Sequence, residues 1–586
     1  MSGSRKRMLG DFDLPDDVWE LILSKLVSET ETEKDNLDDH RNHYLETLSL
    51  VSKQFFSVTN RLIYSLTIYD QSLPRIFRRF PNLTSLDLSG FRGHNLNTLL
   101  SLIPRYSSLS NLTSLNLSNQ TTFPTSGLQT IVKRTKLTLT CLICSNLGSL
   151  DHTGILFIAD SFPSLQQLDI SFPKCITAFR SSDDYNNALQ VLTQRLPKLR
   201  KVNLSGNLYI NDSSLFQLCR NCEFLQDLIM FDCPFITHAG IASAICQRPG
   251  LISISINNIK EARQNKYLTS NFIDSLLSLK CLTHLDLSFS CITDHLLFSL
   301  ANQALPLRNL VLQGCCKYTY TGISYFLSSS RFLQHLDLQN ADFLNDQLFS
   351  NLSVFLRDLV SINVSGCHAL TNSALFAILR NSHLVTEIKM ESTQIGIGPI
   401  PSVDLVVYHQ VKSLHLAYNS ELEDEHINMF AFMFPNMQLL DLSSCCGISK
   451  VKVLKKCPKI RHLKLSLCPQ ANPFLINFEA PKLEVLDLSH SRIDVQVLYA
   501  ISKNFPMLQQ LDLERCYDVT ENGVRLVVEK CTHLRQINLR YCHKLSANIV
   551  SWMIFSRPSL TKIMAPPHFR ACDYDRKFLY RRCLVY

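Results

Sequence analysis

The sequence is poor in the residues and segments that several classes of protein require. It has 17 Gly in 586 residues, and no glycine-rich phosphate-binding loop is found among them. No apolar run is long enough to cross a membrane, and no apolar secretory leader follows Met1. Lys and Arg exceed Asp and Glu by only 58 to 50, and the resulting net charge of +8 is spread thinly. A nucleic-acid-binding face needs concentrated basic charge, so we expect neither nucleic acid nor membrane as a partner.

Catalytic and metal-binding groups also lack the spacing that their chemistry needs. The 18 His are scattered, and no nucleophile, base and orienting group recur together. Cys141 with Cys144, and Cys219 with Cys222, have the spacing of zinc or redox pairs, but no second pair completes a tetrahedral set. The sequence therefore predicts no enzyme activity, no metal and no cofactor. The 21 Cys, without an export signal, are expected to be reduced thiols in the cytoplasm and/or nucleus.

An apolar triplet of the form Leu-x-x-Leu-x-Leu is abundant. Its clearest copy is Leu333, Leu336 and Leu338, and its last member returns at 338, 364, 390, 416 and 442, a period of 26 residues. A fixed period of this length is typical of a solenoid. The triplet predicts a short strand, and the four-residue spacing of Leu348 and Leu352 predicts a helix after it. Neither element can bury its apolar side alone, so successive units must stack.

The triplet pattern resembles the leucine-rich-repeat family over roughly 500 residues. A Cys three residues past many triplets resembles the cysteine-containing subclass, which is typical of F-box proteins, and the overall resemblance is to plant-like members. A ragged nineteenth unit near Leu560 and Ile563 is expected as an end cap. About eighteen repeats end at 88, 117, 144, 170, 204, 230, 256, 287, 312, 338, 364, 390, 416, 442, 465, 488, 513 and 539.

The region before the repeats has a different pattern. Leu14 and Pro15 open a helix with carboxylates in its first turn and an apolar face after it. A second segment from Leu45 to Phe56 and a third that ends near Ile63 complete three short helices. Such a small module has little core of its own and needs a partner surface.

The spacing of these apolar residues resembles the F-box, which docks onto the Skp-type adaptor of cullin-based (SCF) ubiquitin ligases. Phe55 stands where the family often has Trp. An acidic insertion over residues 28–43 is expected to form an exposed, mobile loop. A plain helical cap over the first repeat is the alternative interpretation. The resemblance assigns the adaptor surface to Leu14, Pro15, Val18, Ile22, Leu26, Leu50, Val51, Lys53 and Phe55.

We therefore predict an α/β chain with an N-terminal three-helix F-box and a right-handed leucine-rich-repeat solenoid, strands concave and helices convex. Because no Gly- or Ser-rich linker follows the helices, the junction is expected to be rigid. The C-terminal Cys583 has the form of a prenylation box, although the final Tyr is not a usual ending. The expected divisions are a disordered tail (1–11), the F-box (12–66), the solenoid (67–565) and a basic tail (566–586).

The strand positions between the apolar residues should face the concave side and bind a partner. Early repeats offer Asp87, Asn116, Asp169 and Asn203 there. Later repeats offer basic side chains, and the candidate target-binding residues are Lys464, Arg515, Arg535 and Arg540. A long surface of changing polarity suits a protein or peptide ligand.

The resemblance implies a substrate-recognition subunit of an SCF-type ubiquitin ligase. It would bind a Skp-type adaptor, and through it cullin, and hold an unidentified target protein without doing bond chemistry itself. Two alternatives stay open. In the first, the insertion blocks docking and the chain is a non-degradative scaffold; in the second, the repeats bind a small ligand, which would require converging Lys and Arg.

Overall fold

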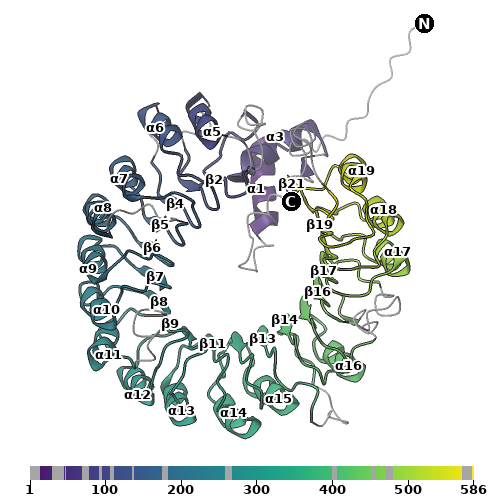
Figure 1. The fold of residues 1–586 in the computed structure, drawn as a ribbon. Helices are drawn as coiled ribbons and strands as arrows, with labels where there is room; N and C mark the ends of the chain where they lie inside the picture. Colours follow the sequence, from purple (N-terminus) through teal and green to yellow (C-terminus); the bar gives the residue numbers. More distant parts are fainter. Residues whose placement is uncertain are drawn as a thin grey trace. The chain divides into compact units, whose positions relative to one another are not determined.

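The computed structural model divides the chain into two compact units, Met1–Leu199 (unit 1) and Arg200–Tyr586 (unit 2) (Figure 1). The predicted tail 1–11, the acidic insertion beyond Ser28, Leu50 and Cys583 lie outside the described residues. The structure describes residues 14–28, 45, 48–49, 51–68, 78–91, 95–105, 111–134, 138–174, 182–257, 267–398, 406–449, 456–468, 479–569 and 584–585.

Unit 1 begins with a helical head formed by α1 (Asp16–Ser28) and α3 (Lys53–Leu62). The predicted continuous segment from Leu45 to Phe56 is wrong, because α3 begins only at Lys53. Ser52 has an extended backbone, and its side chain accepts a hydrogen bond from the Phe55 backbone N–H. This N-cap satisfies a donor that the first helical turn would otherwise leave unpaired, so the chain bends at Ser52.

The head has an apolar core that it shares with the first repeats. Its buried members include Leu23, Leu45 and Val58 from the head and Phe80 from the segment before the second strand, with Trp19 packed against them. The Arg79 guanidinium lies 4.7 Å from the centre of the Phe56 ring. Because one core spans the junction, the head and the first repeats of unit 1 form a single packed body.

Unit 1 continues as a parallel ladder in which the middle leucines of successive strands pair, Leu66 with Leu86 and then Leu115, Leu142 and Leu168. The predicted first strand after the head is thus part of the sheet. The remaining elements are β1 (Ser65–Thr67), β2 (Ser85–Asp87), α5 (Leu96–Leu102), the 3-10 turn η1 (Ile103–Arg105), β3 (Ser114–Asn116), α6 (Thr125–Arg134), β4 (Cys141–Ile143), α7 (His152–Ser161), β5 (Gln167–Asp169) and α8 (Ser182–Arg195).

Unit 2 repeats the same arrangement, with its strands on the inner side of the curve and its helices on the outer side (Figure 1). Its strands are β6 (Lys201–Asn203), β7 (Asp227–Phe231), β8 (Ser253–Asn257), β9 (His284–Asp286), β10 (Asn309–Val311), β11 (His335–Asp337), β12 (Ser361–Asn363), β13 (Glu387–Lys389), β14 (Ser413–His415), β15 (Leu439–Asp441), β16 (His462–Lys464), β17 (Val485–Asp487), β18 (Gln510–Asp512), β19 (Gln536–Asn538), β20 (Lys562–Met564) and β21 (Leu584–Val585). Its helices are α9 (Asp212–Asn221), α10 (His238–Ile245), α11 (Ser270–Leu277), α12 (Asp294–Gln303), α13 (Tyr320–Ser329), α14 (Asp346–Ser353), α15 (Asn372–Asn381), α16 (Asp424–Met433), α17 (Val495–Asn504), α18 (Glu521–Lys530) and α19 (Asn548–Ser556). The predicted repeat fold is confirmed.

The recurring cysteines connect one repeat to the preceding one. The Cys445 thiol donates to the Leu416 carbonyl at 3.2 Å, and Cys516 and Cys542 make the equivalent bonds to Leu488 and Leu513. Burial raises the pKa of these three thiols to about 12. The cysteine side chain is small enough to fill the turn, and its thiol, a weak hydrogen-bond donor, satisfies a buried carbonyl of the preceding repeat.

The sheet continues through the expected nineteenth unit and into the expected C-terminal tail. β20 continues the ladder in unbroken register, with Ile537 opposite Ile563. The last described residues then add β21, which pairs Ile563 with Val585. Val585 is buried. A strand from the tail thus covers the open edge of β20, which would otherwise present unpaired backbone groups.

Within the described residues, every helix is too short or too polar to cross a bilayer.

Candidate functional site

The head exposes apolar side chains although its own core is complete. Val51 is 66% exposed and Leu26 is 54% exposed, and Leu21 is exposed as well. The side chains of Pro15 and Lys53 also face solvent. Large apolar patches on a protein surface commonly mark interaction sites, so these side chains are candidates for a contact with another molecule.

The other predicted adaptor residues support the head from within. Leu14, Val18 and Ile22 are half-buried, and so is Phe55. The Phe55 ring lies 4.8 Å from the ring of Trp19, measured between centroids. Phe55 therefore holds α1 against α3 through this ring contact. Sequence reasoning missed Trp19, whose position one residue after Val18 placed it off the assumed apolar face.

A polar clamp fixes the start of α1 against α3. Arg61 forms an ion pair with Asp16 at 2.7 Å and a second with Glu20. The hydrogen bond from Arg61, more than any other contact, lowers the pKa of the Asp16 carboxyl. The side-chain amide of Gln54 donates to the Leu14 carbonyl and to Asp16, both at 3.1 Å. The clamp sets the position of Leu14 and Pro15 at the entry to the helix.

The inner face of unit 2 carries a second, charged site on β12 to β16. Glu387 on β13 accepts a hydrogen bond from the Ser361 hydroxyl at 2.8 Å and forms an ion pair with Lys389 at 3.2 Å. His415 on β14 lies with its Nε2 3.6 Å from Glu387. The bond to His415, followed by that from Ser361, lowers the pKa of Glu387 to about 2. Glu387 is therefore a carboxylate at any physiological pH.

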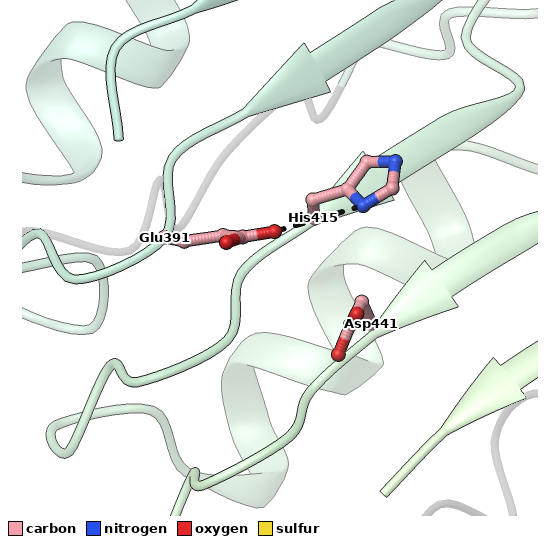
Figure 2. A group of neighbouring side chains, drawn as sticks. All are labelled: Glu391, His415 and Asp441. Carbon is pink, nitrogen blue, oxygen red and sulfur yellow. Dashed lines mark ion pairs between the residues drawn. The ribbon is translucent and has the colours of Figure 1, made fainter. Parts of the chain in front are cut away.

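The other side of the His415 ring faces two further carboxylates. Its Nδ1 lies 3.8 Å from Glu391 (Figure 2). Asp441 on β15 completes a group whose donor atoms all lie within 4.8 Å of one another. Lys464 on β16 reaches Asp441 at 3.3 Å. We name Glu391, His415 and Asp441 the inner-face triad.

The four predicted target-binding residues do not share one site, although Arg515 and Arg540 are neighbours in successive turns. Lys464 lines a hollow of about 160 Å³ over β16 to β20, whose floor includes Asp487, Asp512 and Asn538. Arg515, Arg535 and Arg540 are absent from that lining. The hollow has a mixed lining, in which Leu486, Leu511 and Ile537 stand beside the polar groups. Within it the Asn538 side chain donates to Asp512 at 2.9 Å.

Arg515 and Arg540 lie in turns after the strands, whereas Arg535 precedes β19. The Arg515 backbone N–H donates to the Arg540 carbonyl at 2.8 Å, and the Arg515 guanidinium lies 4.9 Å from the centre of the Tyr541 ring. The backbone of Arg535 belongs to the ladder through its N–H to Gln509. With Lys464 on β16, the four candidate residues thus occupy three kinds of position in the repeat: the strand, the turn after it and the residue before it.

The polar residues predicted to line the face in early repeats have a structural role. Each accepts the backbone N–H of the residue two positions later, which closes the turn after the strand. The donor in each pair is the serine backbone N–H and the acceptor is the side-chain Oδ1: Ser89 to Asp87 at 2.7 Å, Ser118 to Asn116 at 3.0 Å, Ser171 to Asp169 at 2.9 Å and Ser205 to Asn203 at 3.1 Å.

Sequence reasoning missed the bulky side chains that stand in the turns after several strands. Phe289, Tyr418, Leu467 and Tyr541 adopt positive φ and are exposed. That backbone conformation favours Gly or Asn, and a bulky residue there is strained. Beside Phe289, a Cβ on Gly314 would come within 2.6 Å of the ring. All four stand two residues after the last leucine of a triplet, and this shared position could have identified them from the sequence.

The ladder, the alternating helices and the conserved place of the triplet in every repeat make the chain a leucine-rich-repeat protein by fold. The family model described as "Leucine Rich repeat" matches residues 278–295.

Two curated relatives extend this result. The chain is 24% identical to the F-box/LRR-repeat protein 4 of Bos taurus over 199 residues, which are 29% of each chain. It is 21% identical to the BTB/POZ domain-containing protein FBL11 of Arabidopsis thaliana over 271 residues, 46% of this chain and 25% of that one. The chain thus spans well under two thirds of the curated relatives it matches. The predicted resemblance to F-box/leucine-rich-repeat proteins is confirmed, with an animal and a plant among the relatives.

A solved structure also matches over most of the chain. The crystal structure of the TLR13-ssRNA13 complex aligns with 89% of this chain and 84% of its own at 17% identity and a TM-score of 0.44. This likeness is too low to support an argument about binding.

Proposed function

We propose that the chain is the substrate-recognition subunit of an SCF-type cullin ubiquitin ligase. The observation that carries the proposal is the helical head, whose core is closed while Val51, Leu26 and Leu21 remain exposed. The similarity to a protein named for an F-box and leucine-rich repeats supports it. In this proposal Leu14, Pro15, Val18, Ile22, Leu26, Leu50, Val51, Lys53 and Phe55 form or support the surface for a Skp-type adaptor, which links the chain to cullin.

The shared core at the head explains why such a module would be useful. Phe80 packs into the same cluster as Leu23 and Val58, and β1 pairs in register with β2. A rigid connection fixes where the first repeats lie relative to a docked adaptor. A target held by the repeats then stays near the ubiquitin that another subunit carries, which raises its effective concentration. The chain itself supplies no bond chemistry in this scheme.

The target is proposed to be a protein bound on the inner face of unit 2. The exposed Tyr418, Leu467 and Tyr541 resemble the aromatic and apolar anchors of protein interfaces. The charged groups on β13 to β16 would add selectivity, because each requires a complementary partner group. We place the chain in the cytoplasm and/or nucleus, where SCF ligases act and where its thiols stay reduced.

Two other functions remain as alternatives. A non-degradative scaffold would use the same repeats without the adaptor. A small-ligand receptor would require several Lys or Arg side chains around one cavity. In the described hollow of unit 2, Lys464 and Lys562 are accompanied by Asp487 and Asp512, so that hollow offers balanced charge rather than an anion site.

Adaptor capture tests the proposal. The full chain is co-expressed with a Skp-type adaptor, and the amount retained is compared with that of a Val51→Asp, Leu26→Asp variant. Burying these carboxylates at an interface would cost several kcal/mol, so we expect at least a tenfold loss of capture. Leu14→Ala with Pro15→Ala should have the same effect while target binding persists.

Leu208→Asp is the matched control, because Leu208 is an equally exposed leucine of unit 2. It should leave adaptor capture unchanged. Wild-type capture by the Val51→Asp, Leu26→Asp variant, or no capture by the native chain, would favour the scaffold.

A further inference from the structure

We propose that the inner-face triad is a binding site for a divalent transition-metal cation of the Zn²⁺ class. Glu391, His415 and Asp441 come from three successive repeats, yet their donor atoms lie within 4.8 Å of one another (Figure 2). One imidazole and two carboxylates form a donor set that such cations accept. The proposal is independent of adaptor docking, since it concerns unit 2 alone.

The geometry is close to what a metal requires. Ligand atoms about 2.0 to 2.1 Å from a tetrahedral zinc lie roughly 3.4 Å from one another. The His415 Nδ1 and the nearer Glu391 oxygen are 3.8 Å apart, which is too long for a hydrogen bond and slightly too wide for the metal. The three donor atoms, that of Asp441 included, lie within 4.8 Å of one another, so binding requires rotation of the partly exposed Glu391 carboxylate and a smaller adjustment of the other side chains. The backbone ladder that holds the three residues need not move.

A second and independent observation is the group behind the histidine. The His415 Nε2 faces Glu387 at 3.6 Å, and the Ser361 hydroxyl fixes that carboxylate at 2.8 Å. Metal-binding histidines commonly donate their second ring N–H to a carboxylate, which fixes the tautomer and directs the free nitrogen at the metal. Glu387 is placed for this supporting role, although 3.6 Å is longer than a hydrogen bond and the ring must tilt towards it when the ion binds. Nδ1 is then the nitrogen on the side of Glu391.

The surroundings suit a bound ion that remains accessible from one side. The side chains of His415 and Asp441 are only 14% and 9% exposed, so water competes weakly for them. Three protein ligands leave a fourth position open on a tetrahedral ion. That position lies on the inner face and is available to water or to a donor atom of a bound partner.

Lys464 is the internal competitor for this site. Its ammonium lies 3.3 Å from Asp441 and supplies positive charge where the metal would. The Lys464 side chain is 41% exposed and can turn into solvent when a cation arrives. The metal therefore binds in exchange for an ion pair, and its affinity should rise when Lys464 is removed.

Zn²⁺ binding to the full-length chain tests the site. Exposed thiols, among them Cys246, Cys281 and Cys446, are first blocked with N-ethylmaleimide, because they bind zinc on their own. Zn²⁺ is then titrated in competition with a chromogenic chelator. We expect one site that His415→Gln and Glu391→Gln each abolish or weaken at least 100-fold. Co²⁺ in the same site should show d–d bands without a thiolate charge-transfer band.

Three further variants separate a built site from incidental binding. Glu387→Gln should weaken Zn²⁺ by 10- to 100-fold although it removes no ligand. Lys464→Met should tighten it. His462→Ala, on the neighbouring strand and outside the triad, is the matched control and should change nothing.

Native stability of each variant is checked by thermal denaturation, so that loss of binding is not confused with loss of fold. The proposal is overturned if the blocked chain binds no Zn²⁺, or if Glu391→Gln, on its partly exposed side chain, binds it as well as the native chain does.

Discussion

The helical head and the inner face of unit 2 are built on opposite principles. The head keeps its apolar core closed around Leu23 and Val58 and exposes further apolar side chains, whereas the inner face presents charged groups such as Glu387 and Lys389. An apolar surface suits one constant partner, because burying apolar area stabilises a complex without requiring any particular orientation of the groups in contact. A charged surface discriminates among partners, because each group needs its complement. The contrast is what the proposed division between a shared adaptor and a specific target requires.

The largest expected difference between the two regions is their response to alkaline pH. Burial raises the pKa of Cys219, Cys367 and Cys531 in unit 2 to about 12, against an ordinary value near 9. The sequence has no Cys before Cys141, so the head carries none. Above pH 9 the unfolded chain loses thiol protons that the folded chain keeps, so stability falls as pH rises toward 12, by about 1 kcal/mol per pH unit for each thiol.

Chemical denaturation of a Trp552→Phe variant between pH 7 and 10.5 measures this difference. The fluorescence of Trp19 then reports on the head alone, and thiol labelling reports on the repeats. Equal loss of stability in both regions would contradict the assignment to thiols.

A cavity in the head should uncouple it from the first repeats. Leu23→Ala removes a side chain that is almost fully buried in the shared core, and the expected cost is about 2 to 5 kcal/mol. Leu21→Ala, on the same helix but exposed, should cost less than about 0.5 kcal/mol. Thermal denaturation distinguishes the pair, because only the Leu23 side chain contributes to the buried core. Similar effects from both substitutions would mean that the head has no ordered core.

A substitution in a strained turn of unit 2 should raise the stability of the chain and weaken its binding of the target. Tyr418 has a φ of 61° and is 59% exposed, so Tyr418→Gly relieves strain of about 1 kcal/mol. The same substitution removes a proposed anchor, and target capture should drop several-fold. Asn340→Gly is the control, because Asn tolerates this conformation and has no ring to lose. A stability loss in Tyr418→Gly would show that the ring packs against its own repeat.

The smallest expected effect comes from the polar clamp of the head. Arg61→Ala removes ion pairs to Asp16 and Glu20 that are open to solvent, and screening makes such pairs weak. Because the pKa of Asp16 is lowered in the fold, the contribution is present near neutral pH and fades as pH falls below about 4. Thermal denaturation at pH 7 and at pH 3 should show a small destabilisation only at pH 7. An effect as large as that of Leu23→Ala would assign the clamp a major role.

Local patterns predicted the repeats well and the surfaces poorly. The triplet spacing placed strands such as β11 and β12 correctly, because alternation of buried and exposed residues is a property of the sequence itself. The segment Leu45 to Phe56 was misjudged because the side chain of Ser52 caps a new helix, and the apolar pattern alone does not show this. Lys464 and Arg535 were grouped by charge, yet they lie at different points of the repeat.

By itself, the sequence determined the repeat fold, since a 26-residue period of apolar triplets leaves few other ways to bury its leucines. It also determined the place of the recurring cysteines. Only the tertiary structure decided which polar groups meet. Glu391, His415 and Asp441 are separated by 24 residues (391 to 415) and 26 residues (415 to 441), and the parallel register alone brings them within 4.8 Å. The physical reason is that residues one repeat apart along the chain lie on adjacent strands of the sheet, only one strand spacing apart. No local sequence pattern shows which of their side chains then face each other.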